Sequence, residues 1–210
     1  MQAMIESDLY GDFGNDVLYR MCEEHPRHDD VEVVHGKIWL IGRAYAAAIE
    51  RKAKPGFLPK NAAQNLVESE IDRKIDALEK IERIDASNLA TVLDAHCYLT
   101  ERFKATTGLA KRSLASKYLH FHARNAVFIY DSIASMCLNE ALKNVHPTDA
   151  PSVPNGYDDT YATFASRCLY YRDHVIEPHL GRTIGPRELD KWLYRRPGST
   201  PALPASVPMP

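Results

Sequence analysis

The sequence predicts an all-α protein, a compact domain built from several helices. Apolar residues recur at helical spacing along most of the 210 residues, and no alternating pattern of useful length predicts a strand. The composition is that of a globular protein, with 45% hydrophobic and 26% charged residues and a formal net charge of −2. We expect one helical domain over residues 1–196, with packing helices in 1–100 and the functional core in 101–196. The proline-rich residues 197–210 are expected to form a flexible, disordered tail.

The first half of the chain predicts three helices. Residues 31–51 carry apolar side chains on almost every face, which predicts a central buried helix that stops at residues 52–56 (KAKPG). Residues 62–84 have one apolar stripe opposite a face of Glu and Lys, which is typical of a helix covering the core. Residues 88–104 continue the helical pattern until Thr106-Thr107-Gly108, where we expect it to break.

Four further helices are predicted in the second half. Residues 111–122, 131–144 and 157–177 have apolar residues at helical spacing. The last helix is expected over 184–193, because Pro186 followed by an acidic residue is a favourable helix start. Together these patterns place no strand anywhere in the chain.

Several classes of protein are disfavoured by what the sequence lacks. The N-terminus has no apolar signal region, and no apolar run approaches the roughly 20 residues of a membrane span. The four cysteines are far apart and are expected to be reduced, which favours a cytoplasmic protein. Phosphate-loop, dinucleotide-binding and serine-hydrolase motifs are missing. His25 and His28, followed by two aspartates, find no further ligand, so we expect no metal and no cofactor. No obligate protein partner is evident.

The strongest local charge asymmetry lies between residues 102 and 130, a stretch that contains no acidic residue. Gly108 and the preceding threonines form a turn between two predicted helices, where main-chain N–H groups can approach an anion. This pattern predicts a grip on a nucleic-acid backbone, although a solvated basic face would look the same. The candidate phosphate-binding residues are Arg102, Lys104, Gly108, Arg112 and Arg124.

Asp131 and Lys117 are the candidate chemical groups of this segment. Asp131 precedes Ser132 at a predicted helix start, so it is expected to cap that helix, and a capping carboxylate can also face a cleft. Lys117 is expected at the edge of the buried face, where partial desolvation would lower its pKa and make it a usable nucleophile. The alternative is a purely structural role, as a cap and as a lysine whose amine reaches solvent.

The segment RSLASKYLHFHARNAVFIYDSIASMCL (112–138) resembles the core of the helix–hairpin–helix DNA glycosylases, in the branch with the 8-oxoguanine glycosylase-like fold. In that family a Ser–Lys helix with an aromatic end leads through a short apolar stretch into an aspartate that starts the next helix. A later aromatic helix and GPRELDKWLY (185–194) extend the resemblance over about residues 102–195. The matching elements are Ser113, Ser116-Lys117, His120-Phe121, Ile129-Tyr130 and Asp131-Ser132. The chain departs from the family in its hairpin, where Gly108 is the one glycine, and in its spacing, which suits Lys111 better than Lys117.

The resemblance implies a DNA glycosylase that flips a damaged or modified base out of the duplex, in repair or in antiviral defence against phages with modified DNA. Asp131 would then stabilise the sugar cation or activate the nucleophile. Lys117 or Lys111 would attack C1′, or water would do so instead. The implied partner is DNA, and the implied base pocket consists of Trp39, Tyr118, His120 and Phe121.

Two other functions fit the sequence. A HEPN-like ribonuclease is suggested by two arginines that each precede a histidine at short spacing, Arg20 with His25 and Arg167 with His174. A non-catalytic helical DNA-binding or interaction module would need only the caps, the core and the basic stretch. The first of these predicts RNA cleavage, and the second predicts salt-sensitive DNA binding without base release.

Overall fold

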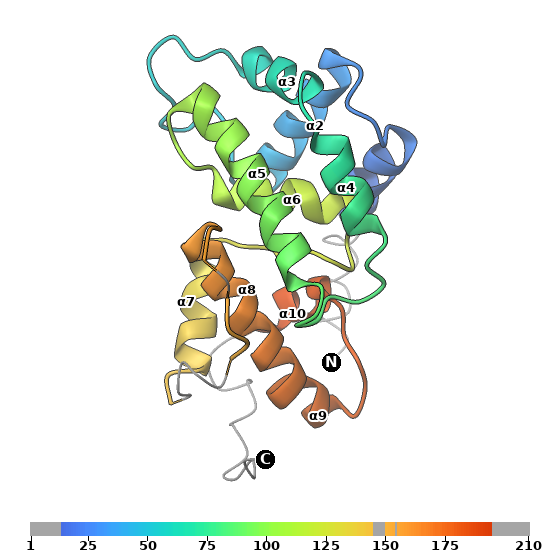
Figure 1. Ribbon diagram of the computed structural model, residues 1–210, viewed down its shortest axis with the longest axis vertical. Coiled ribbons are helices and arrows are strands. Elements are labelled where there is room, and N and C mark those ends of the chain that lie inside the picture. Colours follow the sequence, from blue (N-terminus) through green and yellow to red (C-terminus); the bar gives the residue numbers. More distant parts are fainter. Residues whose placement is uncertain (1–13, 145–149, 154, 195–210) are drawn as a thin grey trace.

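The computed structural model describes residues 14–144, 150–153 and 155–194 (Figure 1), and the expected tail at 197–210 lies outside them. All regular structure in these ranges is helical, which confirms the predicted all-α class. Within the same ranges, no helix is long and apolar enough to cross a membrane. The helical segments are residues 14–24, α2 (Val31–Ala44), α3 (Pro59–Val67), α4 (Ile71–Glu79), α5 (Leu89–Thr107), α6 (Arg112–His122), α7 (Ser132–Ala141), α8 (Asp159–Tyr171), a π-helical turn (Arg172–Ile176), α9 (Glu177–Leu180) and α10 (Pro186–Leu193).

The helices form two groups that meet along α5 (Figure 1). Helices α2 to α6 pack together in one group, and α7 to α10 form the other. The long helix α5 contacts α3, α4 and α6 and also reaches α8 in the second group. Residue 101, where we expected the packing half to give way to the functional half, lies inside α5. The stretch from Ala123 to Asp131 crosses from one group to the other.

The predicted helix at 31–51 is wrong in its second part, because α2 ends at Ala44. The chain turns back so closely that a Cβ at Gly42 would lie 3.2 Å from the Cα of Ala48. The Ala47 N–H donates to the Gly42 carbonyl at 2.7 Å, and Ala46 adopts a positive φ of 51°. Glycine at position 42 therefore permits a compact turn where apolar periodicity suggested a continuing helix.

The predicted helix at 62–84 is two helices, and the one at 157–177 is also interrupted. Ser69 separates α3 from α4, because its hydroxyl donates to the Leu66 carbonyl and accepts from the Ile71 N–H. After Tyr171 the backbone changes to a π-helical turn. The other predicted helices agree within about three residues at each end, an uncertainty that is usual for helix boundaries.

Candidate active site

The connection between α6 and α7 is held in place by polar side chains of α6. The Ser116 hydroxyl accepts from the Tyr130 N–H at 3.0 Å. The His120 ring bonds the Val127 carbonyl through Nδ1 at 2.8 Å, so Nδ1 carries the proton. The apolar residues between these anchors are buried. The chain is thereby fixed on both sides as it approaches Asp131.

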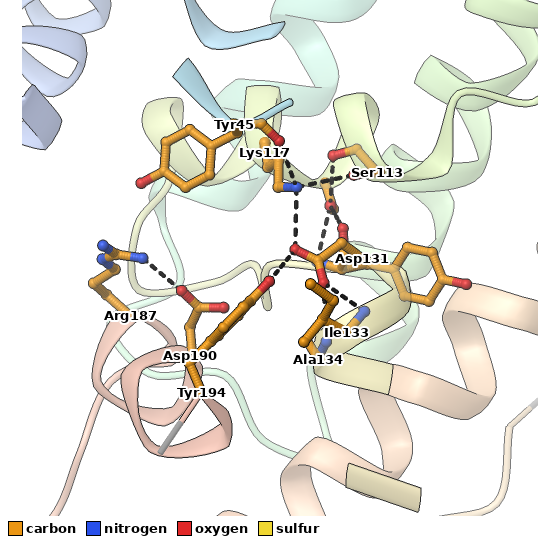
Figure 2. Close-up of polar contacts among 11 residues, drawn as sticks. Tyr45, Ser113, Lys117, Asp131, Ile133, Ala134, Arg187, Asp190 and Tyr194 are labelled. Carbon is orange, nitrogen blue, oxygen red and sulfur yellow. Dashed lines mark hydrogen bonds and ion pairs between the residues drawn. The ribbon is translucent and has the colours of Figure 1, made fainter. Parts of the chain in front are cut away.

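Asp131 uses both carboxylate oxygens (Figure 2). Its Oδ1 accepts from the N–H groups of Ile133 at 3.0 Å and Ala134 at 2.9 Å, which confirms that Asp131 caps α7. Its Oδ2 accepts from Lys117 Nζ at 3.2 Å and from the Tyr194 hydroxyl at 2.5 Å. One oxygen of the carboxylate therefore caps the helix, while the other binds the side chains of Lys117 and Tyr194.

Lys117 is a buried lysine with three oxygen partners, its side chain being only 2% exposed. Besides Asp131, Nζ donates to Ser113 Oγ at 3.0 Å and to the Tyr45 carbonyl at 3.4 Å. Ser113 lies one helical turn before Lys117, so the two side chains share a face of α6. The amine is therefore held in one position rather than reaching out to solvent.

The local environment shifts the pKa of both groups of the pair. Burial lowers the pKa of Lys117, although the negative charge of Asp131 opposes that shift. Burial alone would raise the pKa of Asp131, but hydrogen bonds from Tyr194 and Ala134 and the charge of Lys117 outweigh it and lower that pKa. Asp131 therefore stays ionised, while Lys117 loses its proton more readily than an exposed lysine does.

The pair faces a cleft of about 600 Å³. Such a volume suits a ligand of the size of a nucleotide. Asp131 is the single acidic residue among the described residues that line it. The lining includes the cations Arg51, Lys52, Lys111, Arg112 and Lys117, the aromatic residues Tyr45, Tyr130 and Tyr194, and the apolar residues Leu109 and Ile133.

The expected phosphate-binding residues divide into two sets. Arg112 lines the cleft, where its Nε donates to Asp158 at 2.6 Å. The others lie apart from the cleft lining: Arg102 covers the Tyr98 ring, Lys104 pairs with Glu101, Gly108 ends α5 with a φ of 79°, and Arg124 covers the Tyr19 ring.

Both candidate lysines line the cleft, but their surroundings differ. Lys111 Nζ donates to the Arg51 carbonyl at 2.5 Å, which fixes the turn after α2. Lys117 is the lysine in direct contact with Asp131. The structure therefore pairs Asp131 with Lys117, whereas sequence spacing alone did not decide between Lys117 and Lys111.

The four residues expected to form a base pocket do not line this cleft. Trp39 is half exposed on α2. Tyr118, His120 and Phe121 are buried in the core, where Tyr118 bonds His28 Nε2 at 2.7 Å. Their aromatic character reflects packing of α6 against residues 14–28.

The histidines of the ribonuclease motif lie at the surface. His25 is exposed beyond the helix at 14–24. Arg167 donates to Asn139 at 2.6 Å, whereas the exposed His174 packs on Tyr170. In the described ranges, no group of three His, Cys, Asp or Glu residues is placed to hold a metal ion.

Sequence reasoning missed three parts of the site, namely Tyr45, Tyr194 and the turn after α2. Tyr45 looked like one more core residue of a long helix, and Tyr194 belongs to a segment in which no single residue was singled out. Comparisons with protein-family models, with curated proteins and with solved structures find no match for this chain. The interpretation of the site therefore depends on its own chemistry.

Proposed function

We propose that this protein is a DNA glycosylase, which breaks the bond between a damaged or modified base and its deoxyribose. The observation that carries the proposal is the contact of Lys117 Nζ with the Asp131 carboxylate at 3.2 Å, inside a cleft whose other charged lining residues are all cations. Removal of a base needs a group that stabilises positive charge on the sugar and a nucleophile that reaches C1′.

Asp131 supplies the negative charge. It stays ionised because its pKa is lowered, and it lies in a partly buried site where a fixed charge acts strongly on a developing cation. As the bond to the base breaks, its electron pair leaves with the base, and the positive charge that appears on the sugar is stabilised by Oδ2.

Lys117 supplies the nucleophile. Its amine, once deprotonated, forms a bond from Nζ to C1′ and releases a proton to the departing base. The C1′–O4′ bond then opens, O4′ takes up the second proton from nitrogen, and a Schiff base remains. The lowered pKa of Lys117 raises the fraction of amine that is neutral near neutral pH.

The cleft provides the contacts for the DNA backbone. Arg51 and Lys52 are exposed beside the turn after α2, and Lys111 lies across from them at the start of α6. These cations would neutralise phosphates on either side of the flipped nucleotide. A modified base of phage DNA and a damaged purine are the two substrates that we favour.

The test is base release from DNA of several sources, including phages with modified bases, measured by mass spectrometry. Asn caps a helix as well as Asp does, so Asp131→Asn keeps the cap and removes the charge. We expect release to fall by about 10²–10³-fold. Asp30→Asn is the matched control, because Asp30 caps α2 through the N–H groups of Glu32 and Val33 and lies outside the cleft lining.

Equal release by the wild type and Asp131→Asn would contradict the proposed role of Asp131. DNA binding by the wild type with no base released from any DNA would show a binding module instead.

A further inference from the structure

A second, smaller cavity adjoins the cleft at Asp131. It measures about 310 Å³ and shares Tyr45, Asp131 and Tyr194 with the larger cleft. Its other lining residues are Ile129, Arg187, Asp190 and Lys191, mostly from α10. Figure 2 shows the Arg187–Asp190 pair beside Asp131 and Tyr194. A group bound there would touch the same carboxylate as a sugar in the cleft.

Two residues that line this cavity, Asp190 and Arg187, carry buried polar atoms without partners among the described residues. Asp190 is 7% exposed, and its Oδ2 accepts from Arg187 Nη1 at 2.5 Å. Its Oδ1 is buried and receives no hydrogen bond from the described part of the chain, and Arg187 Nε is buried without an acceptor there. Leaving such groups unpaired is costly, so buried polar atoms of this kind are normally satisfied by ordered water or by a ligand.

The pKa of Asp190 agrees with a carboxylate that lacks a hydrogen-bond donor at one oxygen. Burial raises the pKa of Asp190 to about 6, Arg187 opposes the shift, and the charge of Asp131 adds to it. A hydrogen-bond donor placed against Oδ1 would relieve this desolvation. A structural carboxylate buried for stability alone would normally have both oxygens satisfied.

We propose that this cavity is the base pocket, in which Asp190 Oδ1 accepts an N–H of the flipped nucleobase and Arg187 Nε donates to the acceptor beside it. This inference rests on the proposed glycosylase function and names the group that the site recognises. A nucleobase is a flat ring whose edge presents an N–H donor next to a lone pair, which matches one free acceptor beside one free donor.

The pocket also has suitable walls. Tyr45 and Tyr194 are shared between both cavities, and the Arg187 guanidinium lies 5.9 Å from the centre of the Tyr45 ring. Aromatic rings stack on any base, so the hydrogen-bonding pair would supply the selectivity. The base would then lie in the small cavity, C1′ at Asp131 and Lys117, and the phosphates in the cationic cleft.

The pocket is tested by comparing two measurements on Asp190→Asn. One is the rate of base release, and the other is the affinity for duplex DNA with a tetrahydrofuran abasic analogue, which has no base to recognise. The amide presents a donor as well as an acceptor. We expect the ratio of release rate to abasic-DNA affinity to fall by about 10- to 100-fold.

Glu188→Gln is the matched control, because Glu188 is an acid of the same helix that pairs with Arg182 outside both cavities. It should leave that ratio within about two-fold of wild type. Equal losses of release and abasic-DNA affinity in Asp190→Asn would show a structural role and overturn the pocket, as would an unchanged ratio.

The two proposals fail in different ways. A wild-type protein that neither releases bases nor prefers abasic DNA overturns the glycosylase function itself. The pocket is then judged by the fluorescence of 2-aminopurine riboside, whose edge has an amino donor beside a ring acceptor. Binding weakened by Asp190→Asn would keep the nucleobase site, and no binding to wild type would overturn it.

Discussion

Asp131 and Asp158 occupy equivalent positions at the starts of α7 and α8. Asp131 caps its helix through two backbone N–H groups and Asp158 through that of Tyr161, and each accepts from a cation of α6. In both, burial alone would raise the pKa of the carboxyl, and hydrogen bonds outweigh it and lower that pKa, chiefly those from Tyr194 and Ala134 at Asp131 and that from Arg112 at Asp158. Local sequence chemistry alone would assign the two aspartates one role.

Their partners differ. Asp158 pairs with Arg112, a guanidinium that stays charged under all ordinary conditions and is 36% exposed. Asp131 pairs with Lys117, which is 2% exposed, has a lowered pKa and can lose its proton. Asp131 also lines the cleft. The two caps therefore differ in the cation that the fold places next to the carboxylate. A lysine that can lose its proton makes Asp131, and not Asp158, the candidate for a catalytic role.

The largest effect expected from this contrast is on Lys117. Lys117→Gln removes the amine and keeps a side chain able to bond Ser113, so we expect borohydride trapping on DNA to fall by at least about 10³-fold. Lys111→Gln is the matched control in the same cleft. It should lower trapping by no more than about 10-fold, because Lys111 would contribute only charge and its contact with the Arg51 carbonyl.

The opposite ranking would assign the nucleophile to Lys111, the lysine that sequence spacing favoured. Base release that persists in Lys117→Gln without any trapping in the wild type would assign the attack to water directed by Asp131.

The next effect is on stability and compares Asp131→Asn with Asp158→Asn. Both keep the cap. Asp131→Asn leaves a buried ammonium with no counterion, so the free energy of unfolding at neutral pH should fall by about 3–5 kcal/mol. Asp158→Asn should cost at most about 1 kcal/mol, because Arg112 is partly exposed to water.

The pH dependence checks the cause. The pKa of Asp131 is lowered in the folded protein, so its contribution is present above the unfolded pKa and is lost as pH falls through the folded pKa. The difference between wild type and Asp131→Asn should therefore shrink progressively below about pH 5. Urea titrations at pH 7 and at about pH 3 measure it, and a difference that stays constant would show that the charge pair is not its source.

Helical periodicity was enough to predict the class of fold, because the apolar spacing that defines a helix is local to each segment. The predictions were wrong where a helix breaks because two backbone segments approach closely or because a side chain bonds the backbone. The turn after α2 brings Ala48 so close to position 42 that only glycine leaves room there, and Ser69 separates α3 from α4. An apolar pattern continues through such points without any sign of a break.

The sequence predicted only those contacts of the site that lie within one short segment. Lys117 and Asp131 lie 14 residues apart and could be paired from a single stretch of sequence. Tyr194 lies 63 residues beyond Asp131, and the Tyr45 carbonyl lies 72 residues before Lys117. Three of the expected base-pocket residues, Tyr118, His120 and Phe121, share α6 with Lys117, but their side chains face the core rather than the cleft. Which face of a helix meets a cavity depends on the other helices.

The smallest expected effect is on the salt dependence of DNA binding, and it distinguishes the cations that line the cleft from those outside it. If DNA follows the cleft, Arg51→Gln should reduce the slope of log affinity against log salt concentration by about one, because one phosphate contact is lost.

Arg102→Gln should reduce that slope by less than about half as much, since Arg102 lies over the Tyr98 ring away from the cleft lining. Arg73→Gln on α4 is the control, because Arg73 is exposed and pairs with Glu70 outside the cleft. The measurement is fluorescence anisotropy of a labelled duplex at several salt concentrations. A larger change for Arg102 than for Arg51 would move the DNA to the outer face of α5 and separate it from Asp131, since a backbone held there would not present a nucleotide to the cleft.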